Sequence, residues 1–464
     1  MNLGFIESKT FDEIAVGDTA RTEHVLTTDD AMAFASISGF NSVLNQEELI
    51  QRAGGIPPTG PNMWCASLVS GLFSMNIPGP GVTLTDISLS FHNRIRVGDH
   101  ILVKVEVTSK DEATKIINFS CEAHDGNGLP VFSGTAKVIA PTEKLRWSTV
   151  PVPQVIIKNP YRRYQELIAR ATARSAVRTA IVWPCDEVSL GGAVQAYKDK
   201  LIIPVLVGAE EKIRSVAKDL NLDLENIRIV NVGDSRTAAV KGVELARIGE
   251  VEMLMKGSLH TDELMSAVVS REGGMRTGRR ISHIFALDVP MYHKTLFVTD
   301  AAINIQPDLE TKISILQNAI DAMVKLEVPN PKVAILSAVE SVNPAIPSTL
   351  EAAALCKMVD RGQITGAIVD GPLAFDNAIS SDAAKIKKIT SKVSGDVDLL
   401  MVPNLEAGNI LFKELQYLAG ALAAGVVVGA KVPIVLTSRA DGELARMASC
   451  ALGVLLAKPA IVRE

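Results

Sequence analysis

The chain has 464 residues, 47% of them apolar, and a formal net charge of −5. This length exceeds one ordinary domain, so we expect two or three, and the acidic balance argues against nucleic acid as a main partner. Five scattered cysteines indicate buried thiols in a reducing compartment, and no cluster of metal ligands is visible. No secretory signal is visible, and the most apolar run, residues 418–430, is shorter than the about 20 residues of a membrane span. We therefore expect a cytoplasmic protein without membrane contact.

The first 145 residues begin with helical patterns and continue with strands. One helical pattern runs through Met32 and Phe34, and a second covers residues 62–74. Alternating apolar residues then predict strands, at 101–107, 114–124 and 131–139. This order predicts an α+β domain in which a helix covers one face of an antiparallel sheet.

Four prolines between residues 141 and 160 indicate an extended linker, which we place at residues 146–160. From residue 161 to residue 464, short apolar strands alternate with helices, a pattern typical of a parallel sheet covered on both faces. About 300 residues exceed one compact lobe. We therefore expect two lobes with a cleft, one of residues 161–300 plus 431–464 and one of residues 301–430.

In such sheets ligands bind where strands end, and the segment 431–442 is the most informative end of this kind. An apolar strand runs into Ser438 and Arg439, and a long apolar helix follows. Ser438 and Asp441 have the spacing of a capping box. A cap does not explain Arg439, because a cation at a helix start is unfavourable unless it holds an anion. We predict an anion site here.

Other segments near strand ends are less specific. Lys256–Thr261 combines lysine, glycine, serine and histidine after a strand, although His260 also suits a structural role. The loops at 370–376 and 403–409 suit either ligand binding or a capped helix start. Three arginines within residues 276–280 are either a ligand segment or a solvated face.

Together these segments resemble the phosphate acetyl/butyryltransferase family. Six motifs match in order, at residues 256–261, 276–280, 300–304, 369–373, 403–409 and 436–439. The resemblance covers about residues 160–464. It implies transfer of an acyl group between coenzyme A and inorganic phosphate, with both as substrates and no cofactor. It also implies a two-lobed α/β fold like that of isocitrate and isopropylmalate dehydrogenases, usually assembled as a homo-oligomer.

The resemblance also implies roles for individual residues. Ser438 and Arg439 match the pair that contacts the acyl phosphate. The family's thiol base falls at Ala445, so Asp441 is our candidate base, in a Thr-Ser-Arg-x-Asp form that resembles the butyryltransferase branch. The candidates for substrate binding are Lys256, Gly257, His260, Thr261, Arg276, Asn304, Asp370 and Asn409.

The first 145 residues resemble MaoC-like (R)-specific enoyl-CoA hydratases, which have a hotdog fold. The matching segments are residues 11–18, 34–35, 38–39, 97–99 and 134–136. A fusion of such a domain to a phosphate acyltransferase is a known bifunctional architecture. Here the catalytic aspartate and histidine positions hold Phe40 and Asn45, which cannot exchange protons near neutral pH. We therefore predict a hydratase site that has lost its activity.

Our main prediction is a phosphate acyltransferase, with acetyl as the default acyl group. The alternatives are a bifunctional hydratase and acyltransferase, and a phosphate butyryltransferase. A decarboxylating dehydrogenase of similar fold would need a nicotinamide site and metal-binding aspartates that we do not identify. A non-catalytic acyl-CoA-binding scaffold is favoured if Ala445 in place of the family aspartate abolishes the chemistry.

Overall fold

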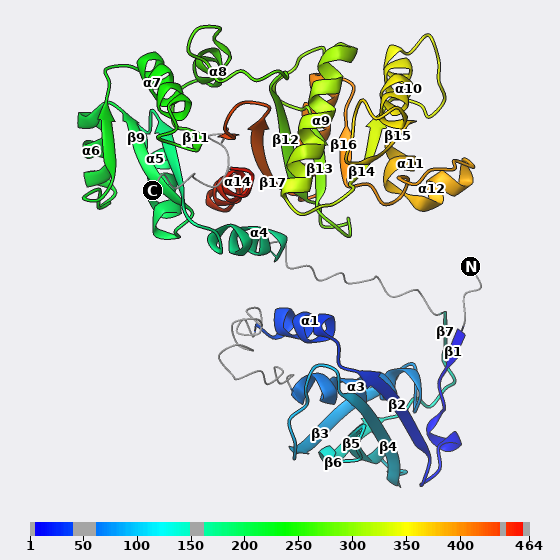
Figure 1. The fold of residues 1–464 in the computed structure, drawn as a ribbon. Helices are drawn as coiled ribbons and strands as arrows, with labels where there is room; N and C mark the ends of the chain where they lie inside the picture. Colours follow the sequence, from blue (N-terminus) through cyan, green and yellow to red (C-terminus); the bar gives the residue numbers. More distant parts are fainter. Residues whose placement is uncertain (1–4, 40–61, 149–161, 437–441, 458–464) are drawn as a thin grey trace. The chain divides into compact units, whose positions relative to one another are not determined.

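The computed structural model describes residues 5–39, 62–148, 162–436 and 442–457. The chain divides into two compact units, residues 1–158 and 159–464 (Figure 1). The predicted linker begins with a strand: Arg146–Ser148 (β7) pairs antiparallel with Phe5–Glu7 (β1). The rest of the predicted linker, residues 149–160, lies outside the described residues.

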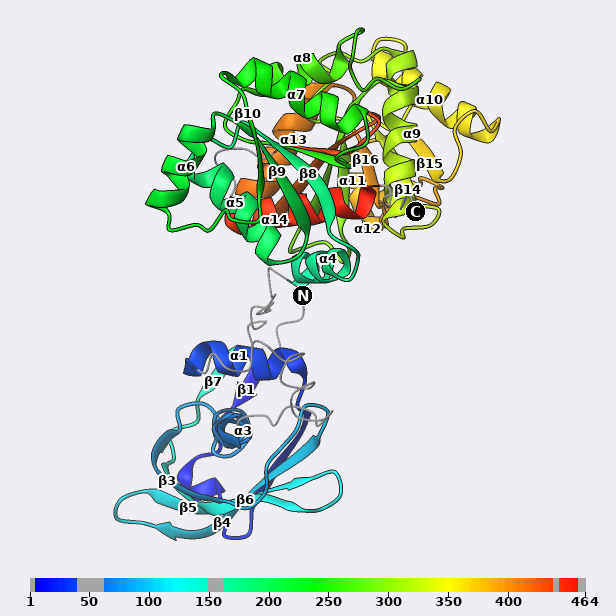
Figure 2. The same ribbon diagram turned by 60° about the vertical axis from the view of Figure 1, so that its left-hand side comes forward.

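The first unit is a five-stranded antiparallel sheet with a long helix, α3 (Asn62–Met75), against one face. Figure 2 looks along α3, which lies inside the curve of the sheet. In sheet order the strands are β2 (Thr19–Val25), β4 (His100–Asp111), β5 (Ile116–Asp125), β6 (Pro130–Ile139) and β3 (Thr83–Phe91). A short 3-10 helix covers Phe11–Glu13, and α1 covers Thr28–Ser38. This is the hotdog arrangement, and it confirms the predicted α+β domain.

The alternation in β4 explains why this sheet has one covered face. Val103 and Val105 are fully buried, whereas Leu102 between the buried positions is 40% exposed. The buried side chains meet the apolar side of α3, where the rings of Phe73 and Phe119 lie 4.9 Å apart. Because strand side chains alternate between faces, one residue of every pair enters the core.

The second unit is built on one continuous sheet of eleven strands. In sheet order these are β10 (Arg228–Asn231), β9 (Ile202–Gly208), β8 (Val177–Val182), β11 (Met253–Lys256), β18 (Ile434–Val435), β17 (Leu422–Val428), β12 (Ser282–Asp288), β13 (Leu296–Thr299), β16 (Leu399–Met401), β14 (Lys332–Leu336) and β15 (Ile368–Leu373). The predicted all-parallel sheet is wrong in the middle, because β17 runs antiparallel to β18 and β12, and β12 to β13. Seven residues connect β12 to β13 and five connect β17 to β18, and such short links favour antiparallel pairing.

Helices cover both faces of this sheet, as predicted. One core contains side chains of α4 (Arg162–Thr172), α5 (Glu187–Lys198), α6 (Glu210–Asp219), α9 (Leu309–Lys325), α10 (Pro347–Asp360) and α14 (Glu443–Leu456). Two further cores contain side chains of α7 (Ser235–Arg247), α8 (Thr261–Val269), α11 (Phe375–Ile379) and α13 (Leu405–Tyr417), and α12 (Ser381–Ile386) follows α11. Ile181 of β8 belongs to the first core, and its neighbours Ala180 and Val182 to another. Successive residues of a strand thus face opposite layers.

The sheet does not divide at residue 300. Strands β12 and β13 fall in the predicted first lobe, yet they pair with β17 and β16 of the predicted second lobe. One half of the sheet therefore consists of β10, β9, β8, β11 and β18, and β17 to β15 form the other half. A sequence pattern predicts where strands are but not which strands pair, so it cannot predict the boundary between the two halves.

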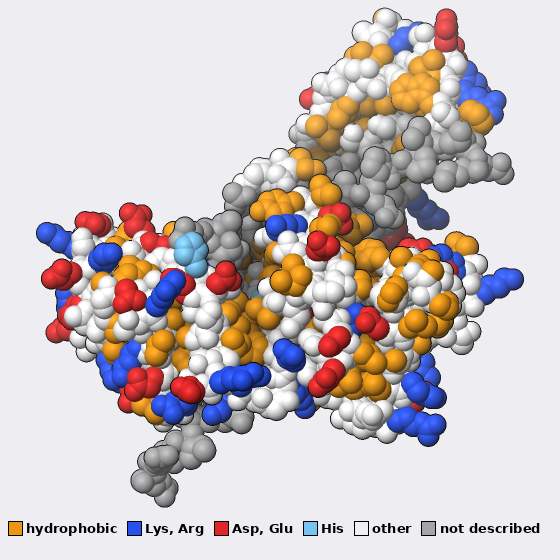
Figure 3. Space-filling view, turned by 90° about the horizontal axis from the view of Figure 1, so that it is seen from above, with side chains coloured by type: hydrophobic (Ala, Val, Ile, Leu, Met, Phe, Trp, Pro, Cys, Tyr) orange, Lys and Arg blue, Asp and Glu red, His pale blue; other side chains and the backbone are white. Residues whose placement is uncertain are grey.

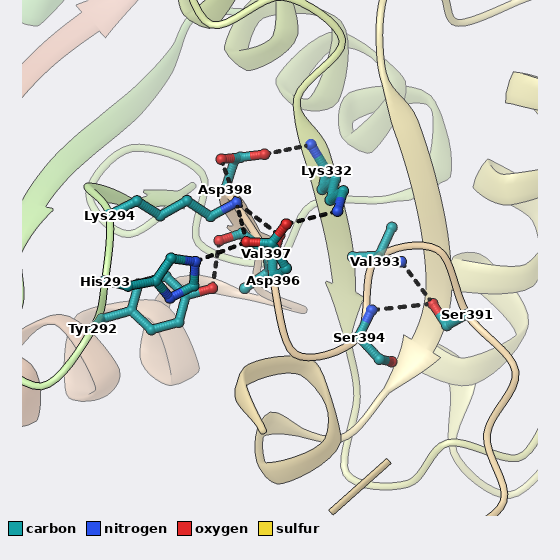
Figure 4. A network of polar contacts seen from close by, with 10 residues as sticks. All are labelled: Tyr292, His293, Lys294, Lys332, Ser391, Val393, Ser394, Asp396, Val397 and Asp398. Carbon is teal, nitrogen blue, oxygen red and sulfur yellow. Dashed lines mark hydrogen bonds and ion pairs between the residues drawn. The ribbon is translucent and has the colours of Figure 1, made fainter. Parts of the chain in front are cut away.

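Charged side chains hold the beginnings of β13, β14 and β16 together (Figure 4). Asp396 accepts from Lys332 at 2.6 Å and pairs with Lys294 at 2.8 Å. Lys294 also reaches Asp398, 2.8 Å away. The two lysine ammonium groups hold the pKa of Asp396 well below its usual range.

Candidate active site

The first half of the sheet contains a reversal of strand order. Strand β8 comes first in the chain, β9 and β10 follow on one side of it, and β11 and β18 lie on the other. All five strands are parallel. In open α/β sheets ligands bind outside the carboxyl ends of the strands at such a reversal. The candidate site is therefore the region where the chain leaves β8 and β11, which we call the crevice.

Trp183, directly after β8, joins the two sides of this crevice. Its carbonyl oxygen accepts hydrogen bonds from the backbone N–H and the hydroxyl of Ser258, both at 2.9 Å. Its φ of 58° lies in the left-handed region, which costs a non-glycine residue about 1–2 kcal/mol. The hydrogen bonds to the loop after β11 hold this conformation, and such strain is typical of functional sites.

Gly257 is required where the two chain segments touch. A Cβ atom at this position would lie 2.4 Å from the carbonyl oxygen of Trp183 and 2.5 Å from that of Val182. The Gly257 N–H donates to the Val182 oxygen at 2.8 Å. The glycine predicted as a binding residue thus also permits the close approach that forms the crevice.

Lys256 is 8% exposed, and its ammonium group points back into its own loop. The Nζ atom donates to the carbonyl oxygens of Gly257 and Leu259, each at 3.1 Å. A buried ammonium needs such partners, because desolvation without hydrogen bonds is costly. The structure thus gives Lys256 a role in shaping the loop, and its contact with substrate stays a prediction.

His260 and Thr261 form the start of α8. His260 is the N-cap residue, and its backbone N–H donates to Glu263 Oε2 at 3.2 Å. Glu263 also accepts from the Ser235 hydroxyl at 3.1 Å. Thr261 is the first residue of the helix. The loop 256–261 therefore brings four of the predicted binding residues to the end of β11.

Asn304 and Asn409 form a second group, around the loop after β13. Asp300, which is 3% exposed, accepts from Asn304 Nδ2 at 2.5 Å and from the backbone N–H groups of residues 302–304. Asn304 Nδ2 also donates to Ile281 O at 2.9 Å, and Asn409 Nδ2 to Ala301 O at 3.4 Å. Burial raises the pKa of Asp300, while these hydrogen bonds act against that rise. Both asparagine side chains thus brace this loop.

Asp370 does not lie in a loop after a strand. Strand β15 continues to Leu373, so Asp370 is within it, opposite Ala334 of β14. Its carboxylate accepts from the Gly371 N–H at 2.8 Å. The sequence indicated a turn because glycine and proline usually end strands. This strand is the last in the sheet order, and a register shift in its pairing accommodates them.

Arg276 lies away from the loop 256–261. It forms a backbone bridge with Ala430, before β18, and Thr277 Oγ1 donates to Gly429 O at 2.7 Å. The next residues line a cavity of about 1360 Å³, together with Glu252 at the beginning of β11. The length of β11 separates this cavity from Ser258. The structure therefore splits the predicted binding residues among separate places.

Comparison with known proteins decides the family. The family model described as phosphate acetyl/butaryl transferase matches residues 234–453. A phosphate acetyltransferase of Rhizobium meliloti is 58% identical over 295 residues, which are 64% of this chain and 93% of that relative. The chain belongs to the phosphate acetyl/butyryltransferase family. The predicted membership is thus confirmed, and with it the class of enzyme, an acyltransferase.

Two further likenesses extend over the same part of this family member. A phosphate butyryltransferase of Clostridium acetobutylicum is 39% identical over 296 residues, covering 64% of this chain and 98% of that relative. The crystal structure of a branched-chain phosphotransacylase from Enterococcus faecalis superposes with a TM-score of 0.53 at 30% identity. It covers 60% of this chain and 98% of that one. The second unit thus has the fold of a phosphotransacylase.

The predicted catalytic residues of this acyltransferase, Ser438, Arg439 and Asp441, lie outside the described residues. So do Phe40 and Asn45 of the first unit. The elements that flank residues 437–441 are described: β18 pairs in parallel with β11, so their carboxyl ends are adjacent.

Ala445, the position at which the resemblance implies the family's thiol base, lies in the first turn of α14. Its carbonyl oxygen accepts from the Ser449 hydroxyl at 2.9 Å. The position offers no proton acceptor of its own to the thiol. Within the described part of this acyltransferase, Trp183 and Ser258 meet in the crevice although they were not predicted as partners. Their meeting depends on the strand order, which no local pattern reveals.

Proposed function

We propose that the second unit transfers an acyl group, acetyl by default, between coenzyme A and inorganic phosphate. The observation that carries this proposal is the 58% identity to a phosphate acetyltransferase across nearly all of that relative. The phosphate butyryltransferase is less similar, at 39%. Acetyl therefore leads over butyryl, and propionyl is the third substrate to compare.

The proposed reaction begins with attack of a phosphate oxygen on the thioester carbonyl carbon. A C–O bond forms, the C–S bond breaks, and the coenzyme A thiolate leaves and takes up a proton. Arg439 and Ser438 are proposed to neutralise the phosphate and the developing oxyanion. Asp441 is proposed to return the proton to the thiolate, and to accept it in the reverse direction. A thiol pKa of about 8.5 makes this exchange easy near neutral pH, and we propose that no cofactor takes part.

The test is phosphate-dependent release of coenzyme A thiol from acetyl-CoA and butyryl-CoA. We expect turnover with both, faster with acetyl-CoA, and loss of turnover in Arg439→Ala. A folded protein that binds acetyl-CoA without turning it over would refute the proposal. The acyl-CoA-binding scaffold would then be the better description.

We propose that the first unit does not hydrate enoyl-CoA. Phe40 and Asn45, at the positions of the hydratase aspartate and histidine, support this because neither side chain can serve as acid or base at neutral pH. The expected result is no hydration of crotonyl-CoA by the full chain. Hydration of crotonyl-CoA by the full chain would restore the bifunctional alternative.

We also propose a cytoplasmic homo-oligomer with small-molecule substrates and no nucleic-acid partner. On the face drawn in Figure 3, basic and acidic side chains are interspersed. Ile410 and Tyr417 on α13 are 58% and 74% exposed, and the adjoining Leu418 86%, an apolar surface that a second copy would cover. Light scattering on wild type and Tyr417→Asp tests this.

The likeness to isocitrate dehydrogenases stays a prediction. Within the described residues, every helix is too short or too polar to cross a bilayer.

A further inference from the structure

Trp183 occupies a position in the crevice that its structural contacts alone do not explain. Its backbone N–H donates to Val207 O of β9 at 2.7 Å, and its carbonyl faces the loop after β11. The backbone thus needs a residue that tolerates the left-handed region, which favours glycine or asparagine. A tryptophan there retains a large ring at the cost of strain.

The indole ring is only partly buried, and a cation lies over it. It packs at the margin of the core formed with α7 and α8, and Lys212 Nζ of α6 lies 5.6 Å from the ring centroid. Within the described residues, no ion pair of 4 Å or less is present for Lys212. An aromatic face with an adjoining cation is the combination that binds a nucleoside base and its phosphate.

The charges around the crevice favour an uncharged group near Trp183. The first turn of α5 carries Glu187 after the N-cap Asp186, and that of α8 carries Asp262 and Glu263. These carboxylates already complement the helix dipoles and repel further anions. A phosphate is therefore better held by Lys212 or by the arginine predicted after β18 than by either helix start.

The row of strand ends sets the length of ligand that could lie along it. The carboxyl ends of β9, β8, β11 and β18 are neighbours in that order. At about 4.8 Å between strands, they span roughly 14 Å. Coenzyme A is an elongated molecule with adenosine at one end and the reacting thiol at the other. It fits this row if adenosine lies near β8 and β9 and the thiol near β18.

The geometry points to Trp183 as the platform on which the adenine ring of coenzyme A stacks, with Lys212 meeting a phosphate of the same nucleotide. This inference rests on the proposed function, since it identifies the binding site of that substrate's nucleotide end. It makes Trp183 a substrate-binding residue that takes no part in the chemistry. The Lys256–Thr261 loop then lies between the nucleotide and the reacting atoms.

The first experiment compares acetyl-CoA with acetyl-pantetheine, which lacks the adenosine. In Trp183→Gly the ring and the backbone strain are both removed. We expect the KM for acetyl-CoA to rise by about tenfold or more, as for loss of one stacked base. We expect kcat to stay within twofold, and kcat/KM for acetyl-pantetheine to stay unchanged. Trp183→Phe should give a smaller rise in the KM for acetyl-CoA, because a smaller aromatic face remains.

Tryptophan fluorescence gives a measurement that does not depend on turnover. The chain has three tryptophans, and Trp64 and Trp147 belong to the first unit. Coenzyme A should quench the fluorescence of the wild type, and the quenching should shrink in Trp183→Phe.

Lys212→Ala should weaken the binding of coenzyme A about threefold at low salt and less at high salt. Lys218→Ala, on the same helix, serves as the control and should leave the binding unchanged.

The outcomes separate this inference from the proposed function. Quenching without turnover of any thioester would refute the function and leave the stacking site standing. Turnover with an unchanged KM for acetyl-CoA in both Trp183 variants would refute the stacking site alone. So would equal losses with acetyl-CoA and acetyl-pantetheine, because they indicate a purely structural residue. If Trp183→Gly does not fold, Trp183→Phe and the quenching decide.

Discussion

The two units of this chain differ in what their sheets demand of the sequence. In the first unit, one apolar face and one helix suffice, and Phe73, Phe119 and Phe132 are fully buried. In the second unit the crevice needs particular contacts, such as Gly257 against Trp183. A core depends on burial and shape, and a site depends on exact close approaches. The loss of site residues that we propose for the first unit is therefore compatible with an intact fold.

The largest expected effect tests whether the two units are energetically separate. Phe119→Ala removes a ring that is completely buried in the first unit, which costs about 3–5 kcal/mol. We expect the first unit to unfold at lower urea concentration while acyl transfer by the second unit stays unchanged. The exposed Leu102→Ala serves as control and should shift stability by about 0.5 kcal/mol or less. A parallel loss of acyl transfer in Phe119→Ala would show that the units stabilise each other.

Gly257→Ala tests the crevice. Its added methyl group would meet two backbone carbonyls, which cannot move as a flexible side chain can. We expect kcat/KM for acetyl-CoA to fall about 100-fold, because a displacement of about 1 Å at a site has effects of this size. Gly233→Ala is the matched control, since nothing lies within 4 Å of its added methyl group. Activity retained in Gly257→Ala would place the site elsewhere.

The sequence predicted best where a local pattern decides the structure. The alternation at residues 101–107 predicted a half-buried strand, and β4 is that strand. The alternating strands and helices predicted a sheet covered on both faces. The partner of each strand could not be predicted. Nothing in residues 282–288 or 422–428 shows that these two strands pair with each other in antiparallel direction.

The candidate site was predictable to the same extent. A lysine, a glycine and a histidine after an apolar strand indicated the loop 256–261, and the structure brings them to the crevice. Asp370 was misplaced because Gly371 and Pro372 suggested a turn, whereas the pairing of β15 with β14 continues past them. Trp183 was not predicted, because its contact with Ser258 depends on the strand order, and no local sequence pattern indicates its left-handed backbone conformation.

His283 connects stability to pH in the second unit. Complete burial lowers its pKa to about 3, against about 6.5 in the unfolded chain. Between these values the unfolded state binds the extra proton, so stability falls as the pH drops below about 6.5, by up to about 1.4 kcal/mol per pH unit. We expect His283→Leu to flatten this dependence in urea unfolding between pH 7 and pH 5. An unchanged slope would mean that other groups cause the acid sensitivity.

The smallest expected effect concerns the charged cluster at the beginnings of β13, β14 and β16. The lysines lower the pKa of Asp396, so its contribution to stability is present above the unfolded pKa and is lost as pH falls through the folded value. The side chain is 45% exposed, so solvent screens the pairs and Asp396→Asn should cost only about 1 kcal/mol. Asp382→Asn, which breaks one exposed pair with Lys385, should cost less. Because Asp396 joins strands of the second unit alone, the urea transition of the first unit should not move in Asp396→Asn. A shift of the first unit's transition in Asp396→Asn would show that the stabilities of the two units are coupled.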